Sequence, residues 1–160
     1  MVSSQPKTST ADVTVHIKDA NDNFPVFRED VYRATIPENA ASGTVVAVVR
    51  AEDADSEAYG TAGIRYTSIR GQIADKLRLD PESGKVVVAT SAHGLDRETA
   101  PEHFLTVEAR DENGRGNRNT VQLHLVLEDI NDNAPTFVLP SYEARIRENA
   151  LDFRTPLVVM

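Results

Sequence analysis

The sequence predicts an all-β sandwich, on the strength of three observations. Apolar and polar residues alternate along several short stretches, turn-forming residues divide these stretches, and no segment shows a convincing helical period. Short strands separated by turns are typical of two antiparallel sheets packed face to face. Apolar residues make up 40% of the 160-residue chain, enough for a core of modest size. With 6% aromatic residues and no Trp, branched aliphatic side chains must fill most of that core.

The expected strands can be placed along the chain. Two Val-rich runs, 44–49 and 85–89, suit core strands because β-branched side chains fit a pleated sheet. Two later stretches alternate with period two, as half-buried strands do. Their apolar positions are Leu105, Val107 and Ala109, followed by Val121, Leu123, Leu125 and Leu127.

Two turns are expected between these strands. In the segment DPESGK, Pro81 and Gly84 suit a turn that needs one fixed φ and then one positive φ. Asn113 and Gly114 form an Asn-Gly pair, which predicts a hairpin before the last strand.

The chain also repeats itself with an offset of 110 residues. The segment DANDNFP at 19–25 returns as DINDNAP at 129–135, and the apolar alternation before the first copy matches that before the second. A repeat of this length indicates an array of similar domains. We therefore predict three parts: the last strand of a preceding repeat at 1–20, a complete repeat at 24–130, and the start of a following repeat at 134–160.

Composition excludes several functions. The formal net charge is −8, which argues against nucleic-acid binding and fits a surface that binds cations. The absence of cysteine excludes thiolate catalysis and zinc–thiolate sites. No stretch approaches 18 consecutive apolar residues, and the first ten residues lack the apolar core of a signal peptide. If the protein is extracellular, its signal and membrane anchor are expected outside this chain.

The two DxNDN segments concentrate oxygen ligands of the kind that Ca²⁺ prefers. An EF-hand loop is the first alternative, because Asp19, Asn21 and Asn23 match its positions 1, 3 and 5. Such a loop requires Gly at its sixth position and Glu at its twelfth. The first copy has Phe24 and Asp30 at these positions, and the second copy fails there as well. The EF-hand interpretation is therefore rejected.

The motif fits an extended linker better. Neighbouring side chains of an extended chain point to opposite sides, so Asp132 can face one domain while Asn131 and the carbonyl of Asn133 face the next. Pro135 restricts Ala134 to extended geometry and favours a stiff exit. Such a linker requires carboxylates from the flanking domains to complete a site.

Further carboxylates are available in four short motifs of the complete repeat. Taken alone, each motif is more typical of a solvated loop, but their coincidence with two DxNDN segments favours metal binding. The motifs are Pro37-Glu38-Asn39, Asp53-Ala54-Asp55, Leu95-Asp96-Arg97-Glu98 and Ala109-Arg110-Asp111.

These motifs together resemble those of extracellular cadherin repeats, in order and in spacing, over essentially the whole chain. The resemblance implies a seven-stranded Greek-key β-sandwich, similar in architecture to immunoglobulin domains, joined end to end with its neighbours by Ca²⁺-bound linkers. One position departs from the family pattern: the Asn-Gly that often follows the Asp-Ala-Asp motif is replaced here by Tyr59-Gly60-Thr61-Ala62-Gly63. The position of one carbonyl ligand is therefore open.

The resemblance also implies a division of ligands between two junctions. The second junction is expected to use Glu38, Asp96, Glu98, Asp132 and the carbonyl of Ile130. The first is expected to use Asn21, the carbonyl of Asn23, Asp53, Asp55 and Asp111. Glu148 would belong to a third junction. The remaining motif positions counted as candidate metal ligands are Asp19, Asp22, Asp129, Asn131 and Asn133. Neither junction is complete, so this chain alone is expected to bind Ca²⁺ incompletely.

The expected function is calcium-dependent cell–cell adhesion at the extracellular side of the plasma membrane. The expected partners are cadherin ectodomains on apposed cells, with no nucleic acid and no small-molecule substrate. A spacer or ligand-binding segment of a receptor is the alternative. An enzyme is disfavoured, because the carboxylate spacing is explained by Ca²⁺ and no nucleophile constellation accompanies it. The four histidines, His16, His93, His103 and His124, lack metal-ligand spacing.

Overall fold

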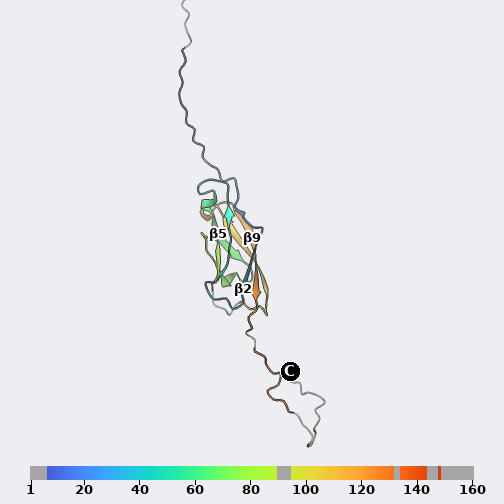
Figure 1. Cartoon of the computed structure of the whole chain (residues 1–160). Helices are drawn as coiled ribbons and strands as arrows, with labels where there is room; N and C mark the ends of the chain where they lie inside the picture. The colour runs from blue at the N-terminus through green and yellow to red at the C-terminus, as the bar shows by residue number, and fades with distance from the viewer. Residues whose placement is uncertain (1–6, 90–94, 132–133, 144–147, 149–160) are drawn as a thin grey trace, which may run out of the picture. The chain divides into compact units, whose positions relative to one another are not determined.

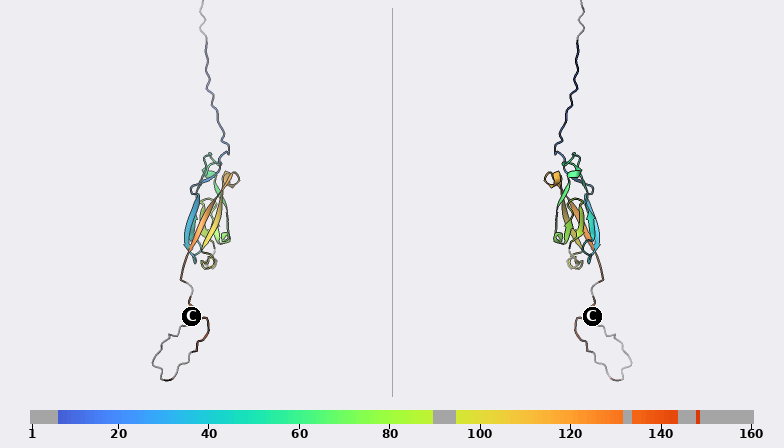
Figure 2. Two further views of the ribbon diagram at one scale, coloured as in Figure 1. Left: turned by 90° about the vertical axis from the view of Figure 1, so that its right-hand side faces the viewer. Right: turned by 90° about the vertical axis from the view of Figure 1, so that its left-hand side faces the viewer.

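The computed structural model describes residues 7–89, 95–131, 134–143 and 148. The chain divides into two compact units, residues 1–129 and residues 130–160. All the strands of the described residues lie in the first unit, which forms a β-sandwich (Figures 1 and 2). None of the described residues forms a helix long and apolar enough to cross a membrane.

The sandwich is built from three hydrogen-bonded sheets. Four strands are ordered β2-β9-β8-β5, three are ordered β3-β7-β6, and β1 pairs with β4. Strands β2 and β9 are parallel, and the other pairs are antiparallel. The bounds are β1 Val26–Phe27, β2 Val31–Pro37, β3 Val45–Val48, β4 Ala51–Glu52, β5 Arg65–Arg70, β6 Leu77–Leu79, β7 Lys85–Val88, β8 Glu102–Arg110 and β9 Arg118–Glu128. Three short 3-10 turns, η1 Thr61–Gly63, η2 Ala74–Lys76 and η3 Glu112–Gly114, lie between strands.

The all-β prediction is confirmed, but the number of strand segments differs from the number expected. The described residues form nine strand segments, whereas seven strands were expected. Two residues separate β3 from β4, and three separate β1 from β2. If each of these interrupted pairs is taken as one bent strand, seven strands remain. The interruptions allow one stretch of chain to pair with different neighbours, since β3 pairs with β7 while β4 pairs with β1.

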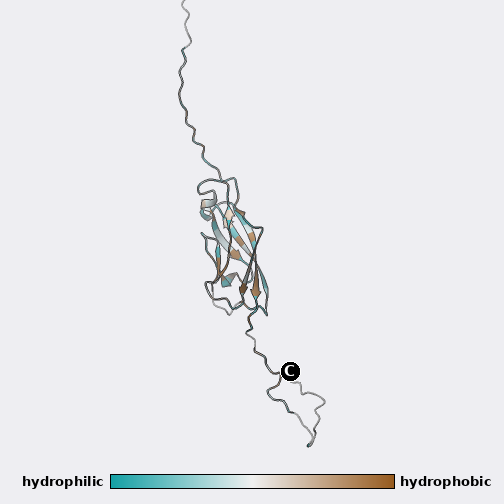
Figure 3. Cartoon of the chain, in the orientation of Figure 1, coloured by the Kyte–Doolittle hydropathy of each residue, from teal (hydrophilic) through white to brown (hydrophobic). Residues whose placement is uncertain are grey.

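The core lies between the sheets and follows the predicted alternation. The apolar positions of β8 and β9 named above are all at most 5% exposed. Leu105 and Leu123 face each other across β8 and β9 and are almost completely buried. In β7, Val86 and Val88 are buried in the same cluster. Figure 3 shows hydrophobic segments within the strands, as expected for a core filled mainly by aliphatic side chains.

Both predicted turns form, with different geometry. Gly84 has φ +65, and a Cβ there would lie 2.3 Å from the carbonyl oxygen of Val49, so glycine is required by both conformation and space. Asp80 Oδ1 accepts a 2.8 Å hydrogen bond from the Ser83 N–H and stabilises this turn. The connection from β8 to β9 is longer than a two-residue hairpin. It runs from Asp111 to Asn117 and has positive φ at Asn113 and Gly114.

The segments outside the sandwich carry no strand among the described residues. The predicted strand residues Val13, Val15 and Ile17 have exposed fractions of 83, 76 and 92%. A strand needs a partner, and none of the described residues pairs with this segment. In the second unit, Tyr142 packs edge-on against Phe137, with ring centroids 5.9 Å apart. The proposed boundaries at 1–20, 24–130 and 134–160 remain predictions.

Candidate metal centres

One end of the sandwich gathers the linker and three aspartates into a group that we call the linker site. Asp53 and Asp55 follow β4, and Asp111 follows β8. Asn21 and Asn23 come from the extended segment before β1. The ends of β4 and β8, which belong to different sheets, meet here, so residues separated by up to 90 positions come into contact. These five residues are those expected at the first junction.

Asn21 joins the linker to the strand ends. Its Nδ2 donates a 3.0 Å hydrogen bond to Oδ1 of Asp111. Asn117, at the start of β9, donates from its Nδ2 to Oδ1 of Asn21 at 2.6 Å and to the carbonyl of Asn23 at 2.7 Å. Both linker oxygens that were predicted as ligands are therefore held by one amide in this structure.

Two carboxylate oxygens of the linker site are buried without a hydrogen bond. Asp111 has an exposed fraction of 0%, and its Oδ2 has no hydrogen-bond partner among the described residues. The Oδ2 of Asp53 is likewise buried and without a partner in this part of the chain. A buried charged oxygen without a partner is destabilising, whereas a hard cation would satisfy it. The donor set at this end therefore fits Ca²⁺.

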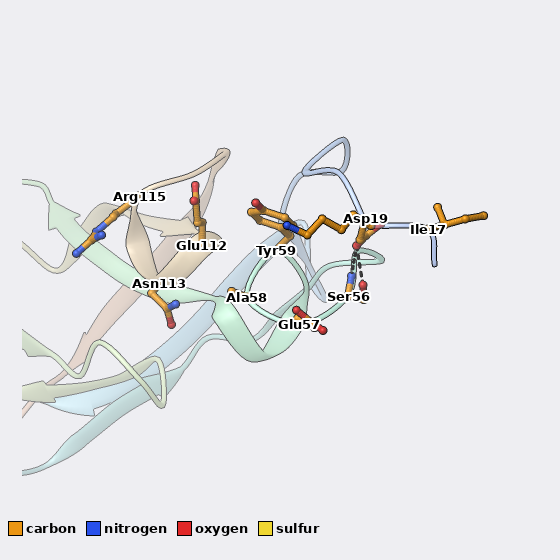
Figure 4. Close-up of a pocket in the computed structure, with 10 residues that line it drawn as sticks. Ile17, Asp19, Ser56, Glu57, Ala58, Tyr59, Glu112, Asn113 and Arg115 are labelled. Atoms are coloured by element: carbon orange, nitrogen blue, oxygen red, sulfur yellow. Dashed lines mark hydrogen bonds between the residues drawn. The ribbon is translucent and has the colours of Figure 1, made fainter. Parts of the chain in front are cut away.

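The other linker residues are also held. The Asn23 N–H donates to Oδ2 of Asp55 at 3.0 Å, and the Asn23 side-chain amide donates to Oδ1 of Asp55 and to Oδ1 of Asp22. Oδ2 of Asp19 accepts hydrogen bonds of 2.7 Å from both the N–H and the hydroxyl of Ser56 (Figure 4). The pKa of Asp19 is lowered below its ordinary value, mainly by the hydrogen bond from the Ser56 N–H and then by that from the Ser56 hydroxyl.

The electrostatics of Asp53 reflect the crowding of carboxylates. Burial raises its pKa, and the N–H of Asp55 partly offsets this by hydrogen bonding to its Oδ1. The negative charges of Asp55, Asp111 and Asp19 raise the pKa further. Without a cation, the arrangement therefore opposes the charged form of Asp53.

Gly116 allows the close approach on which this site depends. A Cβ at this position would lie 1.8 Å from Oδ1 of Asp111 and 2.7 Å from Nδ2 of Asn21. Contacts this short are impossible without displacing one of the two side chains. The loop before β9 must therefore carry glycine here for the hydrogen bond between Asn21 and Asp111 to form.

A pocket of about 610 Å³ opens beside the linker (Figure 4). Residues of the linker and of two loops line it, including Ile17, Asp19, Tyr59 and Glu112. The Glu112 N–H donates to the carbonyl of Ala58 at 2.8 Å, which ties the two loops together. The Tyr59–Gly63 segment, which departs from the family pattern, directly follows Ala58 and so belongs to a loop that this hydrogen bond holds in place.

The second group of carboxylates, which we call the acidic group, contains Glu38, Glu98 and Asp129. One carboxylate oxygen from each lies within 4.8 Å of the others. Glu38 follows β2 and is 2% exposed, and its Oε2 accepts a 2.9 Å hydrogen bond from the Arg97 N–H. The Arg97 side chain lies 3.4 Å from Oδ1 of Asp129. A guanidinium group therefore partly balances the acidic group.

Asp96 is not part of the acidic group. Its carboxylate accepts hydrogen bonds from the Thr99 hydroxyl and from the N–H of Glu98, the latter at 3.1 Å. Hydrogen bonding to Thr99 is the main reason that the pKa of Asp96 is lowered. For Glu98, its own N–H lowers the pKa, but burial and the neighbouring Asp96 and Glu38 outweigh this and raise it. The Asp96 carboxylate therefore lies beside Glu98, at the edge of the acidic group.

The other predicted ligands lie in residues 130–148 of the sequence. Asp132 and Asn133 lie outside the described residues. Asn131 and Glu148 are exposed, and Ile130 has an exposed fraction of 38%. These three residues belong to the second unit. Their assignment as ligands remains a prediction.

Sequence reasoning missed Asn117, Gly116 and Ser56. None of these residues lies in a recognisable acidic motif, because they support the ligands instead of supplying carboxylates. The local signal was weak: Gly116 and Asn117 are a glycine and an asparagine in the loop between Asp111 and β9.

Comparisons with known proteins all point to one family. The profile of the cadherin domain matches residues 32–128. Cadherin-86C of Drosophila melanogaster is 43% identical over 152 residues, which is 95% of this chain and 8% of that protein. Human cadherin-related family member 2 is 40% identical over 141 residues, covering 88% of this chain and 10% of that protein. The chain thus spans about a tenth of the length of these relatives.

Solved structures agree with the sequence comparison. The mouse cadherin-23 EC22-24 structure superposes with a TM-score of 0.66 and 34% identity, covering 77% of this chain and 38% of that one. The matched profile spans more than half of this chain and includes β2 through β9. The chain belongs to the cadherin family.

Proposed function

We propose that this chain acts in calcium-dependent cell–cell adhesion, as an internal repeat of a cadherin ectodomain that Ca²⁺ makes rigid. The proposal includes the extracellular side of the plasma membrane as its location and other cadherin ectodomains as its partners, homophilic or heterophilic. Its cofactor is Ca²⁺. Membership in a family of adhesion domains argues against an enzyme.

The observation that carries the proposal is the buried carboxylate of Asp111. This side chain is completely buried, its Oδ1 accepts a hydrogen bond from Asn21, and its Oδ2 has no partner in the described part of the chain. A folded protein tolerates such an oxygen when a ligand satisfies it in the functional state. The oxygen-rich surroundings match the preference of Ca²⁺ for carboxylate, amide and carbonyl oxygens.

The chain's own residues suggest how binding would stiffen the junction. Ca²⁺, when bound, supplies positive charge that offsets the repulsion between carboxylates. Asp53, Asp55 and Asp111 come from the folded sandwich, whereas Asn21 and Asn23 come from the linker. Ligands drawn from both therefore fix the linker to the sandwich. Asn117 holds the same linker oxygens in this structure, and so orders them near the aspartates.

The acidic group supports a second site at another part of the same unit. Glu38, Glu98 and Asp129 bring three carboxylates within 4.8 Å, close enough to share one cation. The guanidinium group of Arg97 lies 3.4 Å from Asp129. When a cation binds there, this group either moves away or stays beside the ion. We propose that Ile130, Asn131, Asp132 and Asn133 add further ligands, as the family resemblance implies.

The decisive experiment compares shape with and without Ca²⁺. A segment of the natural protein that includes the neighbouring repeats is studied by small-angle X-ray scattering in about 1 mM Ca²⁺ and in chelator. We expect a longer maximum dimension with Ca²⁺, and Mg²⁺ at the same concentration serves as the control. Identical scattering curves in Ca²⁺ and chelator would contradict the proposed rigidification.

Direct adhesion and a spacer role differ in whether this repeat contacts a partner. Beads coated with the full ectodomain are compared with beads on which this repeat is replaced by a neighbouring one. Loss of calcium-dependent aggregation supports direct contact. Unchanged aggregation supports the spacer role.

A further inference from the structure

The outer face of the four-stranded sheet carries a row of arginines that neither the core nor the metal centres use. Arg65 on β5, Arg110 on β8 and Arg118 on β9 are register partners, so they lie side by side on three neighbouring strands. Adjacent strands are roughly 4.8 Å apart, so the three share a span of about 10 Å. Like charges directly opposite each other destabilise a sheet. The row therefore needs partners that offset this repulsion.

A single carboxylate contacts two of these three arginines. Oε1 of Glu108 accepts a 2.9 Å hydrogen bond from Nε of Arg110 and a 2.8 Å bond from the Thr67 hydroxyl. Its Oε2 lies 3.8 Å from Nη1 of Arg118. Glu108 engages Arg110 through Nε, which leaves the two terminal nitrogens of that guanidinium for another anion. Arg65 is held differently, since its Nη1 donates to the carbonyls of Ala62 and Ile64 at 3.2 and 2.8 Å. One negative charge thus orients Arg110 and Arg118 without neutralising the row.

A fourth arginine extends the row along β5. Arg70 is exposed and pairs with Thr106, which puts it on the same outer face. We call Arg65, Arg70, Arg110 and Arg118 the arginine face. Its neighbours on β8 and β9, Thr106 and Thr120, are polar, and the exposed Phe104 lies six residues from Arg110 along β8.

We propose that the arginine face binds a sulfated polysaccharide. Guanidinium groups donate paired hydrogen bonds to oxyanions, and a row of them suits a chain of regularly spaced anions. The surrounding hydroxyl groups can bond to sugar hydroxyls. A protein partner would instead require a central apolar anchor. The exposed Phe104 is stacked on His124 and lies outside the row formed by Arg65, Arg110 and Arg118. This function goes beyond calcium-dependent adhesion.

The net charge of the chain does not prevent such binding. The formal charge is −8, but charges farther away than roughly 8 Å are largely screened at physiological salt. Glu108 is the carboxylate in contact with the row, whereas Asp111, which directly follows Arg110, is turned into the linker site. The assay is therefore run in about 1 mM Ca²⁺, the range in which extracellular modules bind it.

The test measures heparin binding by the 160-residue chain at roughly 0.15 M salt with surface-immobilised heparin. Arg118→Gln and Arg70→Gln remove one charge each from the arginine face. Arg78→Gln removes the same charge from β6, in the other sheet. We expect each of the first two variants to bind roughly two- to five-fold more weakly, as loss of an exposed ion pair implies, and Arg78→Gln to bind as the wild type.

Several results would overturn the proposal. These are undetectable binding by the wild type, equal affinity of all variants, equal loss in Arg78→Gln, or equal binding to desulfated heparin. Self-association of the wild type that Arg118→Gln abolishes, seen by sedimentation velocity without heparin, would assign the face to a second copy of the chain instead. The side chain of Arg118 is 65% exposed, so its replacement is expected to preserve the fold. Calcium binding is measured separately, so either proposal can fail alone.

Discussion

Asn21 donates a hydrogen bond to Oδ1 of Asp111 at 3.0 Å, although 90 residues of chain separate them. The bond fixes the linker against the end of β8 and leaves Oδ2 of Asp111 buried without a partner. A structural hydrogen bond and an unsatisfied oxygen thus share one carboxylate.

Replacing Asp111 by Asn should abolish Ca²⁺ binding at the linker site while preserving the fold. The amide keeps an oxygen that can accept the bond from Asn21, but it removes the charge that attracts the cation. In the wild type, the side-chain NH₂ resonances of Asn21 and Asn117 should shift when Ca²⁺ is added, and in Asp111→Asn they should not. These resonances are followed by heteronuclear NMR during a Ca²⁺ titration.

Asp129→Asn is the matched control for that titration. It removes a carboxylate from the acidic group, not from the linker site. The resonances of Asn21 and Asn117 should therefore still respond to Ca²⁺. If they respond in Asp111→Asn as well, Asp111 is not a ligand.

Gly116→Ala should weaken Ca²⁺ binding through steric displacement. The added Cβ would lie 1.8 Å from Oδ1 of Asp111, so the carboxylate must move away from Asn21. We expect a lower Ca²⁺ affinity by isothermal titration calorimetry, with the sandwich retained by circular dichroism. Ala62→Gly, in the neighbouring 3-10 turn, is a control for a single-methyl change that leaves this contact intact. An affinity equal to that of the wild type would show that the close approach is dispensable.

Ca²⁺ should raise the thermal midpoint of the chain. A ligand that binds only the folded state stabilises it by about 2.7 kcal/mol when its concentration is 100 times its Kd. Differential scanning calorimetry in Ca²⁺, Mg²⁺ and chelator measures the effect. We expect a higher midpoint in Ca²⁺ than in chelator, and a smaller rise in Mg²⁺. Superposable transitions in Ca²⁺ and chelator would argue against Ca²⁺ binding by this chain.

Glu108 should make stability depend on acid pH. Its pKa in the folded chain is lowered, chiefly by the hydrogen bond from Arg110 and then by that from Thr67. A lowered folded-state pKa stabilises the fold above the unfolded pKa of about 4.3, and this stabilisation is lost as the pH falls through the folded value. Urea unfolding between about pH 6 and 3 should show a steeper loss of stability for the wild type than for Glu108→Gln. Parallel curves for the two proteins would show that Glu108 does not contribute to the loss of stability at acid pH.

The shared core of β8 and β9 should carry much of the stability. Leu123 faces Leu105 across these strands with an exposed fraction of 0%. Leu123→Ala should reduce the free energy of unfolding by about 2–5 kcal/mol, because it removes buried methyl groups and leaves a cavity. Gln122→Ala, one position away and exposed, should change it by less than about 0.5 kcal/mol. Chemical denaturation measures both, and similar losses in the two variants would contradict the burial pattern.

The sequence by itself determined the periodic features of this protein. Alternation marked Leu123 and its neighbours as core because a strand turns every second side chain to the same face. Gly84 could be assigned to a turn because few residues adopt positive φ. The 110-residue repeat and its oxygen-rich motifs identified the family and the carboxylates of both candidate metal centres.

Only the tertiary structure decided which side chains meet. Asp96 and Glu98 share one motif, yet Glu98 lies within 4.8 Å of both Glu38 and Asp129, whereas the Asp96 carboxylate bonds to Thr99 and adjoins Glu98. Asn117 reaches the linker because the end of the sheet brings β9 beside it. The arginine face likewise depends on the register of three strands. Local pattern fixes the direction of a side chain along its own strand, whereas contacts between distant segments depend on how the sheets pair and pack.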